Sequence, residues 1–420
     1  MLTVKPFKAI RPRTEPDDAG KIAALPYDVM NTEEAREMVK DKPLSFLHVD
    51  KAEIDLPPGT DPHSDEVYAL AKKNLEYLIN EGHLIQDEKP CFYIYKLNTP
   101  TYFQAGLVAC PSVDDYIEGR IKKHELTRAD KEEDRIRHVD TLNANTGPIF
   151  LMHKPHKELR EIIYDITFHQ KKTYIFLSDE QVLNEVWVVD DPDKIKEIQE
   201  IVNSMDALYI ADGHHRCASA VKVAQMRRNQ FPHYSGDEEF NSFLAVMFPS
   251  DQLSIKDYNR VVKDLNGHST EEFLKLVAEK FDVEKKDAQV KPKDLHTFGM
   301  YLDGSWYKLT AHEDTYPKIG DYKEAVVDAL DVAILQRELL SPILGIEDPR
   351  TDPRIDFVGG IRGIGELERR ASSDMKVAFS MYRTSLDELM AVADAGLIMP
   401  PKSTWFEPKL LSGLFIHSLE

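Results

Sequence analysis

The segment DALYIADGHHR (206–216) places an apolar strand directly before two histidines and an arginine. The pair Asp212-Gly213 stands at the joint, and a glycine there lets the backbone turn sharply and lets a ligand approach it closely. The first N–H groups of the following helix carry a partial positive charge, so the joint suits a phosphate or a carboxylate. Three side chains would add donors to the same anion: His214, His215 and Arg216.

This joint does not match the known glycine-rich phosphate loops. It contains one glycine, and neither G-x-x-x-x-G-K-[ST] nor G-x-G-x-x-G occurs in it. A strand-to-helix turn with a single glycine is also common where no ligand binds. The anion-site interpretation therefore depends on the polar segments that the fold brings to the joint.

The densest polar segment is RIKKHELTRADKEEDRIRHVDTLNANTGP (120–148). It offers a possible base, an orienting hydroxyl and an anion clamp within five residues, which are His124, Glu125, Thr127 and Arg128. A helix opened by Asp130 should follow, with polar residues at three- to four-residue spacing: Lys131, Glu132, Asp134, Arg135 and His138. The alternative is an ordinary solvated helix with ion pairs between successive turns.

A second polar motif is AALPYDVM (23–30), in which Tyr27 and Asp28 follow Pro26 on an expected tight, extended bend. An aspartate in this position is usually a turn former or a helix cap. The functional interpretation is a carboxylate that binds a metal or a substrate amine.

A third motif lies near the C-terminus, in MPPKSTWFEPKLLSGLFIH (399–417). Its prolines predict a rigid polar loop between apolar ends, and four side chains in it could close over an anion: Lys402, Ser403, Thr404 and Lys409. Burial of four apolar residues should hold the segment in place, namely Trp405, Phe406, Leu410 and Phe415. Asn259, Arg260 and Asp331 are weaker candidates with mainly structural explanations, and VGGIRGIGELERR (358–370) reads as a strand–turn–helix joint.

Extended and helical segments that must position these residues alternate along the chain. Helices are predicted at 64–81, 191–204, 214–229, 269–280, 331–343, 363–371 and 385–395. Strands are predicted at 45–49, 91–97, 102–110, 148–152, 173–177, 185–189, 207–211, 243–248, 298–302, 306–310 and 376–382. A tight hairpin is predicted at Asp303-Gly304-Ser305. This alternation predicts a mixed α/β protein that includes antiparallel hairpins.

The bulk composition excludes several classes of function. The chain has 420 residues and a net charge of −20, which argues against a nucleic-acid partner because such proteins present a broad basic face. No stretch approaches the roughly 20 apolar residues that a membrane helix needs, and no signal-peptide core occurs at the N-terminus. The three cysteines form no disulfide framework or Cys-x-x-Cys pattern, so we expect a reducing, cytoplasmic location.

Four motifs carry a family resemblance: PYDV (26–29), KKHELTRADKEEDR (122–135), ADGHHR (211–216) and MPPKSTWFEPKLLSGL (399–414). With them the chain resembles a bacterial and protist family known as a domain of unknown function. The DGHHR element also resembles the phosphate-binding signature of the ParB/sulfiredoxin superfamily. That superfamily includes partition-protein CTPases, sulfiredoxin and free-serine kinases, some of which use pyrophosphate. The resemblance implies a ParB/sulfiredoxin-like catalytic core with large α/β additions.

The resemblance also implies an activity, in which free L-serine is phosphorylated to O-phosphoserine with pyrophosphate, ADP or ATP as donor. The donor phosphates would bind at Asp212, Gly213, His214, His215 and Arg216, with Asp212 as a ligand of Mg²⁺. Glu125 would accept the serine hydroxyl proton, with Asp28 as the second choice. Arg128 and Lys131 would neutralise the donor, and Lys402, Ser403 and Thr404 would complete the pocket. Four residues would contact the substrate: Tyr27, Asp28, His124 and Thr127.

Domain organisation and two other functions stay open at this stage. We expect an N-terminal α/β lobe at 1–120, a catalytic core at 121–285 and a C-terminal α/β region at 286–420. One alternative is a metal-dependent hydrolase in which His124, His214 and His215 bind Zn²⁺, although no His-Glu-x-x-His spacing occurs. The other is a nucleotide-responsive binding protein similar to the partition proteins. The phosphate donor, the direction of flux and the oligomeric state are not determined by the sequence.

Overall fold

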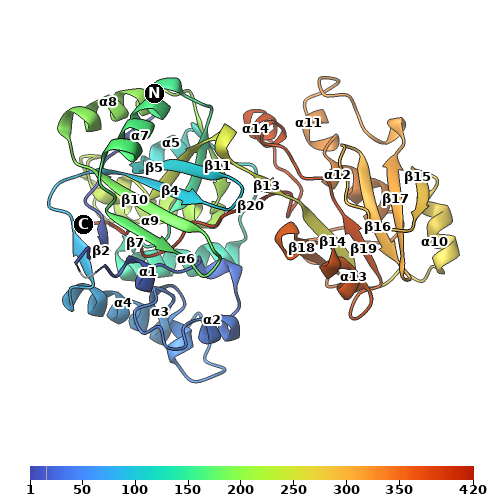
Figure 1. Ribbon diagram of the computed structural model, residues 1–420, viewed down its shortest axis with the longest axis horizontal. Coiled ribbons are helices and arrows are strands. Elements are labelled where there is room, and N and C mark those ends of the chain that lie inside the picture. Colours follow the sequence, from blue (N-terminus) through green and yellow to red (C-terminus); the bar gives the residue numbers. More distant parts are fainter. Residues whose placement is uncertain (16) are drawn as a thin grey trace. The chain divides into compact units, whose positions relative to one another are not determined.

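The computed structural model describes residues 1–15 and 17–420, which form two compact units. Unit 1 consists of Met1–Lys122, Leu126–Leu253 and Pro408–Glu420, and unit 2 of Lys123–Glu125 and Ser254–Glu407. The chain therefore leaves unit 1 twice and returns to it twice. In Figure 1 the long second excursion runs from yellow through orange to red.

Unit 1 is built on a nine-stranded mixed sheet in the order β6-β11-β8-β12-β5-β4-β10-β9, with β1 also paired to β5. Its pairs β6/β11 and β8/β12 are parallel and the others antiparallel. Two small sheets, β2/β3 and β7/β21, accompany it. The strands are β1 Val4–Lys5, β2 Ile10–Pro12, β3 Leu84–Gln86, β4 Phe92–Asn98, β5 Phe103–Pro111, β6 Ile121–Lys122, β7 Ala144–Asn145, β8 Ile149–His153, β9 Tyr174–Leu177, β10 Leu183–Val189, β11 Leu208–Asp212, β12 Ala245–Pro249 and β21 His417–Ser418.

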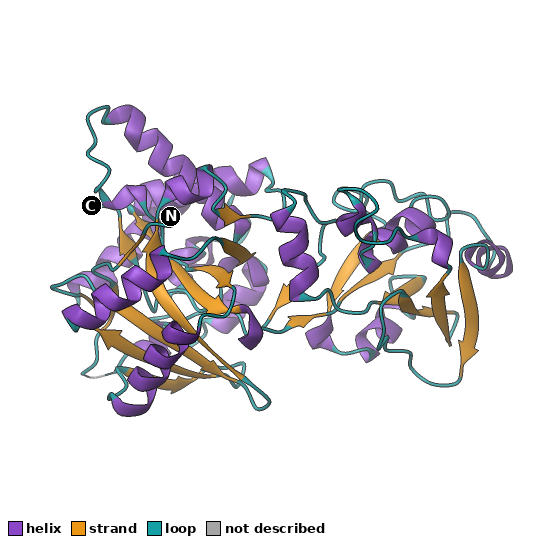
Figure 2. Cartoon of the chain, turned by 90° about the horizontal axis from the view of Figure 1, so that it is seen from above, coloured by secondary structure: helices purple, strands orange, loops and turns teal. Residues whose placement is uncertain are grey.

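Helices of unit 1 pack against this sheet in layers (Figures 1 and 2). They are α1 Ala19–Ile22, α2 Thr32–Met38, α3 Leu47–Asp50, α4 Asp65–Asn80, α5 Val113–Ile117, α6 Ala129–Leu142, α7 Lys157–His169, α8 Pro192–Asn203 and α9 His214–Gln230. One core cluster joins sheet residues to apolar side chains of α7, α8 and α9. In α9 the buried residues are mostly small, including Ala220 and Ala224, which lets this helix lie close to its neighbours. A second cluster unites α2, α3 and α4.

Unit 2 contains a six-stranded sheet, ordered β15-β17-β16-β19-β14-β18, in which every pair is antiparallel. Unit 2 also contains a separate two-stranded antiparallel sheet, β13/β20. The strands are β13 Ile255–Lys256, β14 Tyr258–Val262, β15 Phe281–Lys286, β16 Thr297–Leu302, β17 Ser305–Ala311, β18 Ile355–Gly359, β19 Val377–Ser380 and β20 Trp405–Phe406. The helices are α10 Thr270–Val277, α11 Ala325–Asp328, α12 Asp331–Leu335, α13 Gly365–Ala371 and α14 Leu386–Asp394.

The mixed α/β class predicted from the sequence is confirmed. The predicted hairpin is present, because β16 and β17 are joined by Asp303 and Gly304, whose φ angles are 46° and 76°. None of the helices in the described ranges is both long and apolar enough to cross a membrane. The three cysteines are buried and form no disulfide.

One predicted element is wrong, and two others differ in their local geometry. The run at 45–49, expected as a strand, instead leads into helix α3, because Phe46, Val49 and Asp50 recur at helical spacing and bury one face. The helix expected at 331–343 continues after α12 as a π-helical turn over Gln336–Leu340. The bend expected to be extended at Asp28 is a short 3₁₀ helix, Tyr27–Val29, preceded by an extended Pro26.

The division into two units differs from the three regions expected from the sequence. The expected boundary between residues 285 and 286 falls within β15, inside unit 2. The C-terminal motif is divided instead, since Lys402–Thr404 belong to unit 2 and Lys409 to unit 1.

Candidate functional site

The joint between β11 and α9 has the geometry that the sequence predicts. Strand β11 ends at Asp212, Gly213 has a φ of 90°, and α9 begins at His214. Just before the joint, the pairing of β11 with β8 shifts register between Ile210 and Asp212, an irregularity that redirects side chains at a strand end. The first turn of α9 contains no acidic residue, which favours an anion at the positive end of the helix dipole.

Arg216, in the first turn of α9, is the most unusual side chain at this joint. It is nine-tenths buried, and its guanidinium packs on Gly213, where a Cβ atom would lie 3.1 Å from Nε. Nη1 donates to the carbonyl of Pro148 at 2.5 Å, but the buried Nε has no hydrogen-bond partner. Burial alone would lower the pKa of Arg216, yet the carboxylates of Asp28 and Asp212 outweigh it and raise that pKa.

Asp212 is surrounded by positive charge. Its Oδ2 lies 3.2 Å from Nζ of Lys409 and 3.8 Å from Nη2 of Arg216, while Oδ1 accepts the N–H of Gly213 at 3.0 Å. Burial would raise the pKa of this carboxyl, but the charges of Lys409 and Arg216 hold it well below its ordinary value. Asp212 is therefore a fixed carboxylate that orients two cations.

A pocket in unit 1 opens beside Arg216. Its lining combines charged, polar and apolar residues from separate parts of the chain, which are Tyr27, Asp50, Arg135, His138, Val139, Asn145, Thr146, Gly147, Ile149, Arg216 and Ser412. The ring of Tyr27 stacks under the guanidinium of Arg135, with 3.9 Å from Cζ to the ring centroid. Burial raises the pKa of the Tyr27 hydroxyl despite the charge of Arg135, so the Tyr27 side chain is a neutral phenol near pH 7.

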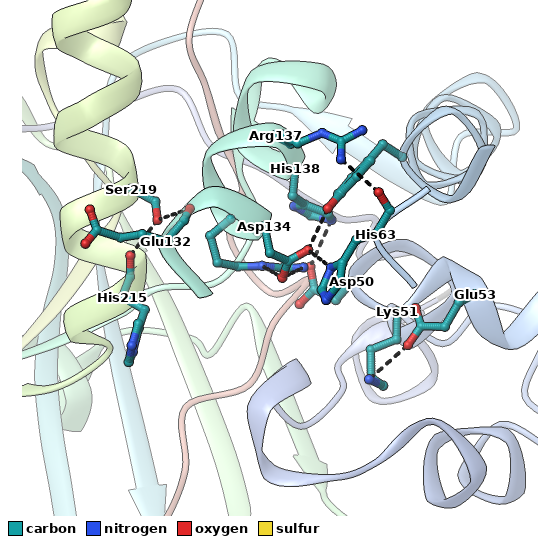
Figure 3. Close-up of polar contacts among 12 residues, drawn as sticks. Asp50, Lys51, Glu53, His63, Glu132, Asp134, Arg137, His138, His215 and Ser219 are labelled. Carbon is teal, nitrogen blue, oxygen red and sulfur yellow. Dashed lines mark hydrogen bonds and ion pairs between the residues drawn. The ribbon is translucent and has the colours of Figure 1, made fainter. Parts of the chain in front are cut away.

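The wall formed by α6 and α3 is a network of buried polar groups (Figure 3). Asp134 accepts hydrogen bonds from Nε of Arg135 at 2.9 Å and from the hydroxyl of Tyr68 at 2.8 Å. His138 donates through Nε2 to the carbonyl of Val49 at 3.2 Å. Burial, assisted by the charge of Arg135, lowers the pKa of His138 to about 4, so its ring is neutral near pH 7.

His215 connects α9 with the start of α6. Its Nε2 lies 3.0 Å from the backbone N–H of Arg128, and because an N–H can only donate, Nε2 is the acceptor. The lone pair of this nitrogen is therefore engaged, which argues against His215 as a zinc ligand through Nε2. Nearby, the hydroxyl of Thr127 donates to Glu132 at 2.5 Å, and the exposed guanidinium of Arg128 pairs with Asp130 at 2.9 Å.

Five predicted site residues belong to unit 2: His124, Glu125, Lys402, Ser403 and Thr404. Within that unit the backbone N–H of Met399 donates to the carbonyl of His124 at 2.8 Å, and the hydroxyl of Thr404 lies 3.5 Å from Nε2 of His124. The two predicted segments are therefore adjacent.

The loop that carries Lys402 is held by buried donors. Nη2 of Arg260 donates to the carbonyls of Lys402 at 3.1 Å and Pro401 at 3.5 Å, and the hydroxyl of Thr384 donates to the carbonyl of Ser403 at 3.0 Å. Burial lowers the pKa of Arg260 to about 10, and no ion pair in the described part of the chain involves it. Arg260 therefore has a defined role toward the loop that the sequence did not reveal.

In unit 1 the structure gathers four predicted residues around the guanidinium of Arg216, which are Tyr27, Asp28, Asp212 and Gly213. Lys131 is exposed on α6 and Arg128 is engaged with Asp130, so neither lines the pocket. Sequence reasoning missed Asp50, which directly follows the wrongly predicted strand at 45–49, and Thr146. The sequence left a solvated helix as the alternative for the charged segment at 129–142, whereas Asp134, Arg135 and His138 are buried. Their clustering before Asn-Thr-Gly (145–147) was the available signal.

The donor set around Asp212 does not fit a magnesium ion. Mg²⁺ binds carboxylate oxygens that face water or phosphate. Here one oxygen of Asp212 faces Lys409 and Arg216, and the other accepts a backbone hydrogen bond. We therefore assign Asp212 to the positioning of cations and not to metal binding.

Fold and site together define a mixed α/β protein with a candidate anion pocket at a strand-to-helix joint. The chain belongs to the family described as a protein of unknown function, DUF1015, which it matches over residues 4–333. No curated protein matches it.

Among solved structures the chain is similar to SbnI with a C-terminal truncation from Staphylococcus aureus, at 13% identity over 72% of this chain and 85% of that chain, with a TM-score of 0.38. A mutant free serine kinase in complex with AMP is 14% identical over 72% of this chain and 86% of that chain, with a TM-score of 0.36. A conserved hypothetical protein from Pyrococcus furiosus is 12% identical over 73% and 94% of the chains, with a TM-score of 0.33.

Proposed function

We propose that this protein is a small-molecule phosphotransferase that phosphorylates free L-serine to O-phosphoserine, with pyrophosphate as the donor. The observation that carries the proposal is the buried Nε of Arg216, which has no partner and lies at the start of a helix without acidic residues in its first turn. A buried unpaired donor is costly unless a ligand satisfies it. A phosphate oxygen is a suitable acceptor for a guanidinium at a helix start.

Phosphoryl transfer needs positioning and charge neutralisation more than covalent chemistry from the protein. Arg216 and the first N–H groups of α9 would supply both to the transferred phosphoryl group. Asp212, which is itself fixed by Lys409, would hold that guanidinium in place. Mg²⁺ would enter with the donor phosphate, without Asp212 as its ligand. Glu125 and Asp28 stay the two candidate proton acceptors, and the ParB/sulfiredoxin-like core stays a prediction.

The test is a parallel assay of the purified protein with Mg²⁺ and L-serine. Pyrophosphate, ADP and ATP are offered separately, and O-phosphoserine is measured. We expect product with pyrophosphate, and a loss of at least about 100-fold in kcat/KM on Arg216→Lys, because lysine cannot reproduce the guanidinium fork. Product with ADP or ATP alone would reassign the donor.

A matched control lies on the same helix. Arg228, near the end of α9, pairs with Asp114 at 2.7 Å and is not in the pocket. Arg228→Lys should leave turnover within about twofold of the unmodified protein. Absence of O-phosphoserine with every donor, from folded protein, would refute the proposed function.

A further inference from the structure

The pocket beside Arg216 also contains a buried carboxylate that the anion site does not need. Asp50 is 5% exposed and ends helix α3. Its Oδ1 accepts the hydroxyl of Thr146 at 2.8 Å and lies 4.0 Å from Nε2 of His138. Its Oδ2 makes no hydrogen bond within the described residues. A carboxylate that lines a phosphate pocket would repel the phosphate unless it serves another part of the ligand.

Neighbouring groups do not neutralise Asp50 by contact. The ring of His138 is neutral near pH 7, since burial lowers its pKa to about 4. Arg135 directs Nε and Nη2 to Asp134, both at 2.9 Å. Arg216 has its salt bridge with Asp212. Asp50 thus acts on both arginines only through space, and one of its oxygens is left for a donor from the ligand.

The lining of the pocket therefore contains groups of opposite charge. It includes the carboxylate of Asp50, with the Thr146 hydroxyl beside it, and the guanidinium of Arg216. The pocket is small and partly open to solvent. This arrangement fits a small molecule that has two functional groups. One is a cationic group for Asp50, and the other is a group that carries or receives a phosphoryl group near Arg216.

We propose that this pocket is the acceptor site and that it recognises an α-amino acid through its ammonium group, which donates to Asp50. This inference rests on the proposed function. The ammonium group at Asp50 would direct the side-chain hydroxyl of the amino acid toward Arg216 and the start of α9. The site thereby selects amino acids over hydroxy acids of the same size that lack the amine, because they would leave the buried carboxylate without its donor.

The test uses Asp50→Asn, which keeps an oxygen that can accept from Thr146 but removes the negative charge. Asp115→Asn is the matched control, because Asp115 is a buried carboxylate of the same unit that binds Arg120 at 2.5 Å outside the pocket. Binding of L-serine and of 3-hydroxypropanoate, which lacks the amine, is measured by calorimetry, and both compounds are compared as acceptors. Thermal unfolding shows whether each variant is folded.

We expect Asp50→Asn to raise the KM and the dissociation constant for L-serine by about 10- to 100-fold, as for loss of a charge-assisted hydrogen bond. The values for 3-hydroxypropanoate should change by less than about threefold, so discrimination between the two acceptors collapses. Asp115→Asn should retain discrimination. An unchanged KM for L-serine, or a loss confined to kcat, would overturn the assignment, the latter because it indicates a proton acceptor.

The binding experiment separates this inference from the phosphotransferase proposal. L-serine that binds to the unmodified protein and not to folded Asp50→Asn supports the acceptor site even if no donor gives product. Product formation with equal use of both acceptors would support the transferase and refute the ammonium site. No binding of L-serine at millimolar concentration to the unmodified protein would refute the acceptor site directly.

Discussion

Nζ of Lys409 lies 3.2 Å from Oδ2 of Asp212, although 197 residues separate them in the chain. The last segment of the chain thus returns to unit 1 and fixes the carboxylate at the end of β11. Asp212 in turn lies 3.8 Å from the guanidinium of Arg216. The contact connects two motifs that the sequence placed in different expected regions.

Lys409→Met should destabilise the protein by about 1–2 kcal/mol near pH 7, because it leaves a partly buried carboxylate with one cation fewer. The pKa of Asp212 is lowered in the folded state, so its stabilisation is complete above its ordinary pKa of about 3.9 and is lost as the pH falls toward the folded value. The difference in unfolding free energy between the two proteins should therefore shrink below about pH 4. Urea unfolding at pH 7 and pH 3 measures it, and an equal difference at both values would contradict the explanation.

Gly213→Ala should affect both stability and anion binding. A φ of 90° costs an L-residue about 1–2 kcal/mol, and the new Cβ would lie 3.1 Å from Nε of Arg216. Gly59→Ala is the control, because Gly59 has a φ of 87° and nothing within 4 Å of a Cβ. Both variants should lose similar stability in denaturant unfolding. Only Gly213→Ala should weaken pyrophosphate binding, by about tenfold or more, and equal binding by both would show that Gly213 matters for its backbone alone.

His138 should make the protein acid-sensitive above the range in which carboxylates titrate. Its folded pKa is lowered to about 4, below the unfolded value of about 6.5, so the unfolded state binds an additional proton between these values. The unfolding free energy should then fall by up to ~1.4 kcal/mol per pH unit as the pH drops from 6.5 to 4. His138→Gln retains a donor for Val49 and removes the titration, and its unfolding free energy should vary less over this window. Parallel curves for the two proteins would assign the acid sensitivity elsewhere.

Arg260→Met should release the loop of residues 399–404 in unit 2, because two of its carbonyls lose their donor. We expect trypsin to cleave after Lys402 at least about tenfold faster than in the unmodified protein. Arg354→Met is the control, since Arg354 also donates to two carbonyls of unit 2, those of Leu344 and Gly345, at 3.0 and 2.9 Å. Cleavage after Lys402 that is unchanged by Arg260→Met, or equally accelerated by both variants, would rule out a specific role.

Local patterns in the sequence determined much of the fold. The strand before Asp212, the turn at Gly213 and the helix after it were predictable because each depends on neighbouring residues: an apolar run, a residue that tolerates positive φ, and a series of good helix formers. The hairpin at Asp303-Gly304 was predictable for the same reason. The short run at 45–49 was not, since four or five apolar residues fit a strand or a helical turn equally well, and packing against α4 decided for the helix.

Tertiary structure alone decided which candidate residues share a site. Arg216 was visible in the sequence, but its unpartnered Nε exists only because Gly213, Pro148 and Asp212 surround it. Asp50 had no motif around it and became a candidate only when folding placed it beside Thr146, 96 residues later in the chain. The sequence determined the chemistry that is present and the local elements that carry it. Long-range packing determined which charges are desolvated and which face each other, and no local pattern encodes that because it depends on residues far apart in the chain.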